Sequence, residues 1–90
     1  MKLLALETST EACSVAVSVD GQIHERFDIG QHHSDVILGM VQQVLAEAGL
    51  TLKQLDVIAF SRGPGSFTSL RIGAGVAQGL AFGADLPVIP

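Results

Sequence analysis

The segment that most constrains the fold is a short apolar run followed by a glycine-rich turn and a long apolar stretch. Residues 57–60 (VIAF) predict a buried strand, and the Gly-Pro-Gly sequence at 63–65 predicts a tight turn directly after it. Residues 67–83 predict a helix, which Ser66 or Thr68 would open. In α/β proteins a loop of this kind directs backbone N–H groups towards the carboxyl end of the strand, where ligands and partners bind.

This turn has two interpretations. It lacks the Gly-Lys-Ser/Thr ending of a Walker P-loop. Its amides either bind an anion, or its glycines only allow the helix to pack closely against the strand.

The rest of the chain predicts more strands and a second helix. Apolar or alternating segments predict five strands in all: residues 2–7, 12–19, 22–29, 57–61 and one that begins near Pro87. Asp20 and Gly21 predict a hairpin turn, so the first three strands form an antiparallel meander. The second helix is predicted over residues 34–48, with Gly49 directly after its end.

Composition excludes several classes of protein. The 90 residues carry a formal net charge of −4 and only five scattered basic residues, so the chain has no patch that binds nucleic acid by itself. The single cysteine, Cys13, excludes a disulfide framework within the chain and is typical of a reducing cytoplasm. No stretch is long and apolar enough for a signal sequence or a membrane span. We therefore expect a cytoplasmic protein that makes no contact with membranes and meets RNA only indirectly.

Two motifs resemble a known protein family. Residues 62–73 read RGPGSFTSLRIG, residues 4–10 read LALETST, and the match continues through QGLA at 78–81. In type and order they resemble the TsaB (YeaZ) family of bacterial tRNA threonylcarbamoyladenosine biosynthesis proteins, over essentially all 90 residues. Ser69 stands where the family motif usually has glycine, and a serine in the first helical turn is easily tolerated.

The resemblance implies a fold that the pattern alone gives only as α/β with a mixed sheet. It implies a ribonuclease-H-like lobe of the actin, hexokinase and Hsp70 superfamily, in which an antiparallel three-strand meander is followed by βα units. Members of the family continue well beyond this length. We therefore interpret residues 1–90 as the amino-terminal part of the first actin-like lobe, with the fold incomplete in this chain.

The resemblance also implies a function without catalysis. It implies a scaffold or activator subunit of the complex that forms threonylcarbamoyladenosine in tRNA, paired with the catalytic TsaD-type subunit. A TsaE-type ATPase would join the pair, and TsaC would make the threonylcarbamoyl-adenylate. The chain would have no cofactor of its own, and ATP would enter only through partner subunits. A homodimer is an alternative assembly.

A polar turn after the first strand is the candidate cofactor site. It consists of Glu7, Thr8, Ser9 and Thr10, and in nucleotide-binding relatives of the implied fold this turn wraps a phosphate. An acid with small hydroxyl residues after it can hold a metal ion and phosphate oxygens. Alternatively, the hydroxyls satisfy the backbone of a hairpin. The first interpretation would make the protein an ATP-binding phosphotransferase of the actin-like fold.

No residues combine into a catalytic or metal-binding set. Cys13 shares a strand face with valines and has no basic neighbour, so we predict a small buried side chain. His24 is alone on a strand face that we expect to be exposed, and the adjacent His32 and His33 cannot both face one metal from a helix. A second alternative function is a peptidase, because this family was once grouped with glycoproteases, but the sequence supplies no catalytic residues for it.

Both helices have more apolar surface than packing on one sheet requires. On the helix predicted over residues 67–83 and at its end, the following residues would cover the sheet: Leu70, Gly73, Ala77, Leu80, Ala81 and Ala84. The opposite face of this helix and the broad apolar face of the helix over residues 34–48 predict partner contacts at Val36, Met40, Val44, Thr68, Arg71, Ile72, Gly75, Gly79 and Phe82. Each interior glycine costs roughly 0.8–1 kcal/mol relative to alanine, which favours the close approach of another helix. Alternatively, the rest of a longer protein covers these faces.

Overall fold

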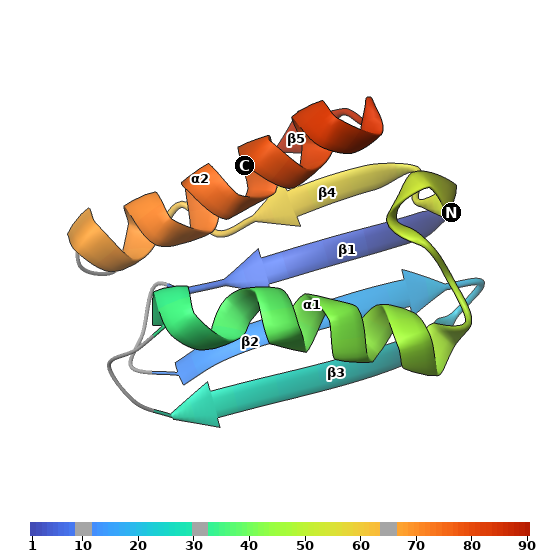
Figure 1. Ribbon diagram of the computed structural model, residues 1–90, viewed down its shortest axis with the longest axis horizontal. Coiled ribbons are helices and arrows are strands. Elements are labelled where there is room, and N and C mark those ends of the chain that lie inside the picture. Colours follow the sequence, from blue (N-terminus) through green and yellow to red (C-terminus); the bar gives the residue numbers. More distant parts are fainter. Residues whose placement is uncertain (9–11, 30–32, 64–66) are drawn as a thin grey trace.

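Five strands form one mixed sheet in the computed structural model, which describes residues 1–8, 12–29, 33–63 and 67–90. The elements in chain order are β1 (Lys2–Glu7), β2 (Ala12–Val19), β3 (Gln22–Ile29), α1 (His33–Ala48), the short 3₁₀ helix η1 (Leu52–Gln54), β4 (Val57–Phe60), α2 (Phe67–Ala84) and β5 (Val88–Ile89). The strand order is β3-β2-β1-β4-β5, antiparallel from β3 to β1 and parallel from β1 to β5 (Figure 1). This confirms the meander followed by βα units.

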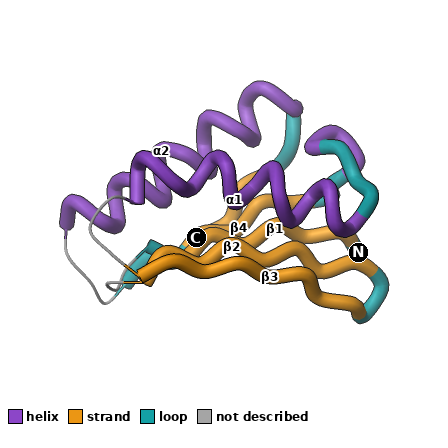
Figure 2. Tube along the Cα trace, turned by 60° about the horizontal axis from the view of Figure 1, so that its bottom comes forward, coloured by secondary structure: helices purple, strands orange, loops and turns teal. Residues whose placement is uncertain are grey.

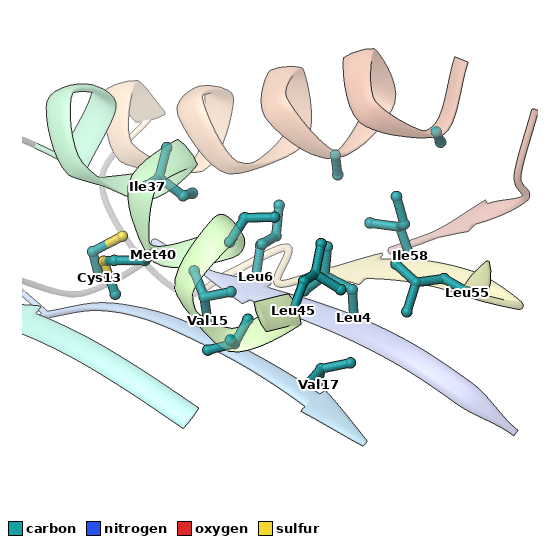
Figure 3. Packing of buried hydrophobic residues seen from close by; sticks show 14 residues of the cluster. Leu4, Leu6, Cys13, Val15, Val17, Ile37, Met40, Leu45, Leu55 and Ile58 are labelled. Atoms are coloured by element: carbon teal, nitrogen blue, oxygen red, sulfur yellow. The ribbon is translucent and has the colours of Figure 1, made fainter. Parts of the chain in front are cut away.

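Both helices lie on the same face of the sheet, so the described chain has two layers (Figure 2). α1 packs over β2 and β3, and α2 packs over β4, β1 and β5. The core between the layers consists of alternate strand residues and the inner stripes of both helices, including Leu4, Leu6, Val15, Ile37 and Ile58 (Figure 3). The strands contribute at every second residue because successive side chains point to opposite faces.

Backbone geometry explains where several elements end. Asp20 and Gly21 both have positive φ, 50° and 88°, the pair that a tight hairpin between twisted strands requires. At the end of α1, the N–H of Leu50 donates to the carbonyl of Leu45 at 2.9 Å, and Gly49 has φ 71°. These features are those of a Schellman motif, which satisfies the last carbonyls of the helix.

In the edge strand β3, the polar residues and not the apolar ones point to the side of the sheet that the helices cover. Its polar residues share the helix-facing side with the core, because His24 pairs with Val17 in the antiparallel register and Arg26 pairs with Val15. The exposed-face prediction for His24 is therefore wrong, and its side chain is half-buried. Arg26 instead forms an ion pair with Glu47 of α1 across the margin of the core.

The apolar residues of β3 are on the opposite side of the sheet. Ile23, Phe27 and Ile29 remain 69%, 67% and 70% exposed, and none of the residues that the structure describes covers them. On the helix-facing side, a long polar side chain such as that of Arg26 can bury its stem against the edge of the core and keep its charged end in water. Polar residues can therefore occupy the inward side of this edge strand, and the expectation that its apolar residues point inward fails.

Candidate partner interface

Helix α2 turns one face to the sheet and the opposite face to solvent. On the sheet side Ala77 is 0% exposed and Ala81 is 3% exposed. On the outer side Thr68, Arg71, Gly75 and Gly79 are exposed, Ile72 is half-buried, and Phe82 is 91% exposed. The helix therefore has the orientation that its sequence predicts. We call Thr68, Arg71, Ile72, Gly75, Gly79 and Phe82 the outer face of α2.

The glycines of α2 differ in what surrounds them. A methyl group added at Gly73 would lie 2.5 Å from the Thr8 Oγ1 atom, so close packing within the chain explains that glycine. At Gly75, Gly79 and Gly83 the described part of the chain places nothing within 4 Å of an added methyl group. Each costs roughly 0.8–1 kcal/mol in a helix interior relative to alanine. Gly75 and Gly79 thus leave open backbone on the outer face, for which the described chain offers no internal reason.

The amino-terminal end of this face is hollowed. Thr68, Arg71 and Ile72 line a hollow of about 290 Å³. Its lining combines a hydroxyl, a guanidinium and an aliphatic side chain, and the exposed Phe82 lies towards the other end of the helix. Apolar contact with a few polar groups at the margin is a common composition for protein–protein interfaces.

The predicted contribution of α1 to this surface is mostly wrong. Met40 is 7% exposed and lies in the core of this chain (Figure 3). Val44 is 0% exposed and belongs to the same core. Val36 is half-buried and packs against the same core. The apolar stripe of α1 is broad because the helix contacts both the sheet and α2. Leu38 of α1 is 51% exposed, and helical periodicity alone does not distinguish it from the buried apolar residues of that helix.

The turn after β1 is described only in part. Thr8 is 1% exposed, and Glu7 is half-buried at the end of its strand. Thr8 lies against Gly73 of α2, so its side chain is enclosed by protein in this structure. Ser9 and Thr10 lie outside the described residues, as does His32. A cofactor site at this turn therefore stays a prediction.

Cys13 is buried, as its strand face predicts. Its side chain is 0% exposed, and burial, followed by the charge of Asp28, raises the pKa of its thiol above the ordinary value of 9.0. A thiol in this state is a poor nucleophile at neutral pH.

The described residues contain neither a cluster of metal ligands nor a membrane-spanning helix. Within residues 1–8, 12–29, 33–63 and 67–90, no three His, Cys, Asp or Glu side chains gather closely enough to hold a metal ion. In the same ranges neither helix combines the length and the apolar character that a bilayer crossing requires.

Comparison with known proteins places this geometry in a family. The family model described as TsaD, tRNA N6-adenosine threonylcarbamoyltransferase, matches residues 14–90. The tRNA threonylcarbamoyladenosine biosynthesis proteins TsaB of Haemophilus influenzae and Escherichia coli are 58% and 50% identical over 100% and 99% of this chain. YeaZ from Pseudomonas aeruginosa superposes with a TM-score of 0.93 at 48% identity, over 99% of this chain and 43% of that one. The chain belongs to the TsaB (YeaZ) branch of the TsaD family.

Two further comparisons define the extent of this similarity. The chain spans 39% of the length of each of the two TsaB proteins. RuvC from T. thermophilus, in complex with a Holliday junction substrate, is 13% identical with a TM-score of 0.63 over all of this chain and 64% of its own. The RuvC likeness concerns the fold alone, and it agrees with the ribonuclease-H-like sheet of the TsaB family.

Proposed function

We propose that this chain belongs to a non-catalytic subunit of the complex that forms threonylcarbamoyladenosine in tRNA. In this proposal the outer face of α2 docks on the TsaD-type catalytic subunit and holds it in an active state. The relatives named TsaB support the pathway, and the outer face of α2 supports docking. The subunit would act in the cytoplasm with a TsaE-type ATPase, and ATP would bind through the partner subunits.

The observation that carries the proposal is the unexplained glycine pattern on the outer face. Gly75 and Gly79 are one helical turn apart, exposed, and free of neighbours in the described chain. Small residues at this spacing allow two helix backbones to approach closely, and Phe82 supplies a large apolar side chain beside them. Aromatic side chains often contribute much of the energy of an interface.

Charge is consistent with an indirect contact with RNA. The formal net charge of −4 disfavours binding to a polyanion. We propose that the catalytic subunit, and not this chain, holds the tRNA.

Reconstitution tests the proposed role. We expect no threonylcarbamoyl transfer by the native protein alone, and transfer when the TsaD-type, TsaE-type and TsaC-type proteins of the same genome are added. The measurement is threonylcarbamoyladenosine formed in tRNA by the purified components. Turnover by the protein alone would rule out the non-catalytic role. Full activity of the other components in its absence would rule out the activator role.

Substitutions on α2 test the docking face. Gly75→Leu or Gly79→Leu should weaken association with the TsaD-type subunit about tenfold or more, because overpacking a close contact typically costs 1–3 kcal/mol. The fold should be retained, since each change removes a helix-destabilising glycine from an exposed position. Ala77→Leu is the matched control, because Ala77 is 0% exposed on the sheet side and a larger residue there should damage folding. Normal binding by both glycine variants would exclude this face.

A further inference from the structure

The two sequence motifs of this chain meet at one contact. Thr8 lies in the 4–10 motif at the end of β1, and Gly73 is the last residue of the 62–73 motif within α2. A methyl group added at Gly73 would lie 2.5 Å from Thr8 Oγ1 and 3.6 Å from both Thr8 Cβ and Cγ2. Gly73 has no positive φ, so the close approach of Thr8, and not an unusual backbone conformation, explains the glycine.

We propose that Thr8 and Gly73 form a positioning contact that sets how closely α2 approaches the end of β1. By setting the position of α2 relative to β1, the contact determines how the outer face of α2 is presented to a partner. The second half of this inference rests on the proposed docking function. The first half concerns only the chain itself.

The side chain of Thr8 has little freedom to move away from residue 73. It is 1% exposed, and its β-branched side chain has heavy atoms at two of the three positions around Cβ. Other interactions also involve Thr8. Since a separation of 2.5 Å is closer than real methyl contacts, a larger residue at 73 must displace α2, the end of β1, or both.

Displacement at Gly73 would be transmitted to the outer face. Ile72 precedes it in the chain and Gly75 follows two residues later, both on the outer face. The 18 residues of α2 form one continuous helix, in which neighbouring turns are joined by backbone hydrogen bonds. A shift of the helix at residue 73 therefore moves the surface that a partner would contact.

Four variants of the native protein test the contact. They are Gly73→Ala, Thr8→Ala/Gly73→Ala, Thr8→Val/Gly73→Ala and the control Gly83→Ala. Alanine at position 8 removes the atom at 2.5 Å and leaves Cβ at 3.6 Å, an ordinary contact distance. Valine keeps both branches and should not relieve the overlap. Gly83→Ala changes a glycine of the same helix that has open space around it.

The readouts are the backbone amide chemical shifts of α2 and the Kd for the TsaD-type subunit, measured where every variant is folded. Gly73→Ala should move the amide shifts along α2 and raise the Kd about tenfold. Thr8→Ala/Gly73→Ala should return both towards wild type, whereas Thr8→Val/Gly73→Ala should not. Gly83→Ala should shift only the amides near residue 83 and leave the Kd unchanged.

The outcomes separate this inference from the docking proposal. If Gly73→Ala changes neither the amide shifts nor the Kd, the positioning contact is wrong even where Gly75→Leu abolishes binding. If Gly75→Leu and Gly79→Leu bind normally, the docking face is wrong. In that case only the amide chemical shifts of α2 test the contact. Shifts displaced by Gly73→Ala and restored in Thr8→Ala/Gly73→Ala would support it. Amide shifts of α2 displaced equally in both double variants would overturn it, because the displacement would then not depend on the size of residue 8.

Discussion

At the scale of single residues, the buried thiol of Cys13 shows how an environment decides chemistry. Its pKa is raised first by burial and second by Asp28, which pairs with it across the β2–β3 ladder. Both causes disfavour the thiolate. The side chain acts as a small apolar group of the core, and the redox and nucleophilic chemistry of cysteine is suppressed.

The raised pKa predicts a dependence of stability on pH. The unfolded thiol ionises near its ordinary value of 9.0, while the folded thiol stays protonated to higher pH. The contribution of Cys13 is therefore complete below pH 9.0 and is lost as the pH rises from there towards the folded pKa. The slope for a single proton cannot exceed about 1.4 kcal/mol per pH unit in that window. Urea unfolding of wild type and Cys13→Ala at several pH values measures it.

The expected result is a difference between wild type and Cys13→Ala that is constant near neutral pH and shrinks above pH 9.0. A thiol reagent should label the native protein only as fast as it unfolds, because the side chain is 0% exposed. Rapid labelling under native conditions would show that the thiol is accessible.

At the scale of elements, the two helices end in the same motif with different residues. Gly49 follows α1 with φ 71°, and Asp85 follows α2 with φ 57°. After α2, the N–H of Leu86 donates to the carbonyl of Ala81 at 2.8 Å, the same spacing as between Leu50 and Leu45 after α1. The left-handed conformation suits glycine, and aspartate tolerates it at some cost.

We therefore expect Asp85→Gly to stabilise the protein by about 0.5–1 kcal/mol. Gly49→Asp should destabilise it by a similar amount, since a side chain would be introduced at the corresponding position of α1. Neither should alter partner binding. Chemical denaturation of both variants measures the two changes, and a loss of stability in Asp85→Gly would contradict this account of the α2 end.

At the scale of the whole molecule, the two faces of the sheet are unequal. α1 and α2 cover one face of the sheet (Figure 2). Ile23, Phe27 and Ile29 are 67–70% exposed on the other face. β3 is also an edge of the sheet in the described residues. An exposed apolar face beside a strand edge favours association of the isolated chain.

For the 90-residue chain we expect Phe27→Lys to lower binding of a hydrophobic dye and to raise solubility. Circular dichroism should show the fold unchanged, because Phe27 makes no part of the core. Gln42→Lys adds the same charge at an exposed position of α1 and is the control. Equal effects of the two substitutions would mean that net charge, and not the apolar face, governs association.

Local chemistry was sufficient to predict the elements and their order. The Asp20-Gly21 turn, the helix end at Gly49 and the order of β4 followed by α2 depend on residues adjacent in the chain, and the structure confirms each. Pro64, Gly65 and Ser66, at the predicted turn and helix start, lie outside the described residues. The inward face of α2 was also predictable, because small apolar residues recur there at helical spacing. The family followed from two motifs that need no tertiary information.

Tertiary structure alone decided which surfaces remain available. Met40 and Val44 are in the core because α1 contacts α2 as well as the sheet, and His24 faces inward because the register of β3 with β2 places it there. The contact between Thr8 and Gly73 joins segments 65 positions apart and has no local signal beyond a glycine in a helix. Periodicity identifies an apolar stripe, but the elements that pack around it determine how much of the stripe is buried.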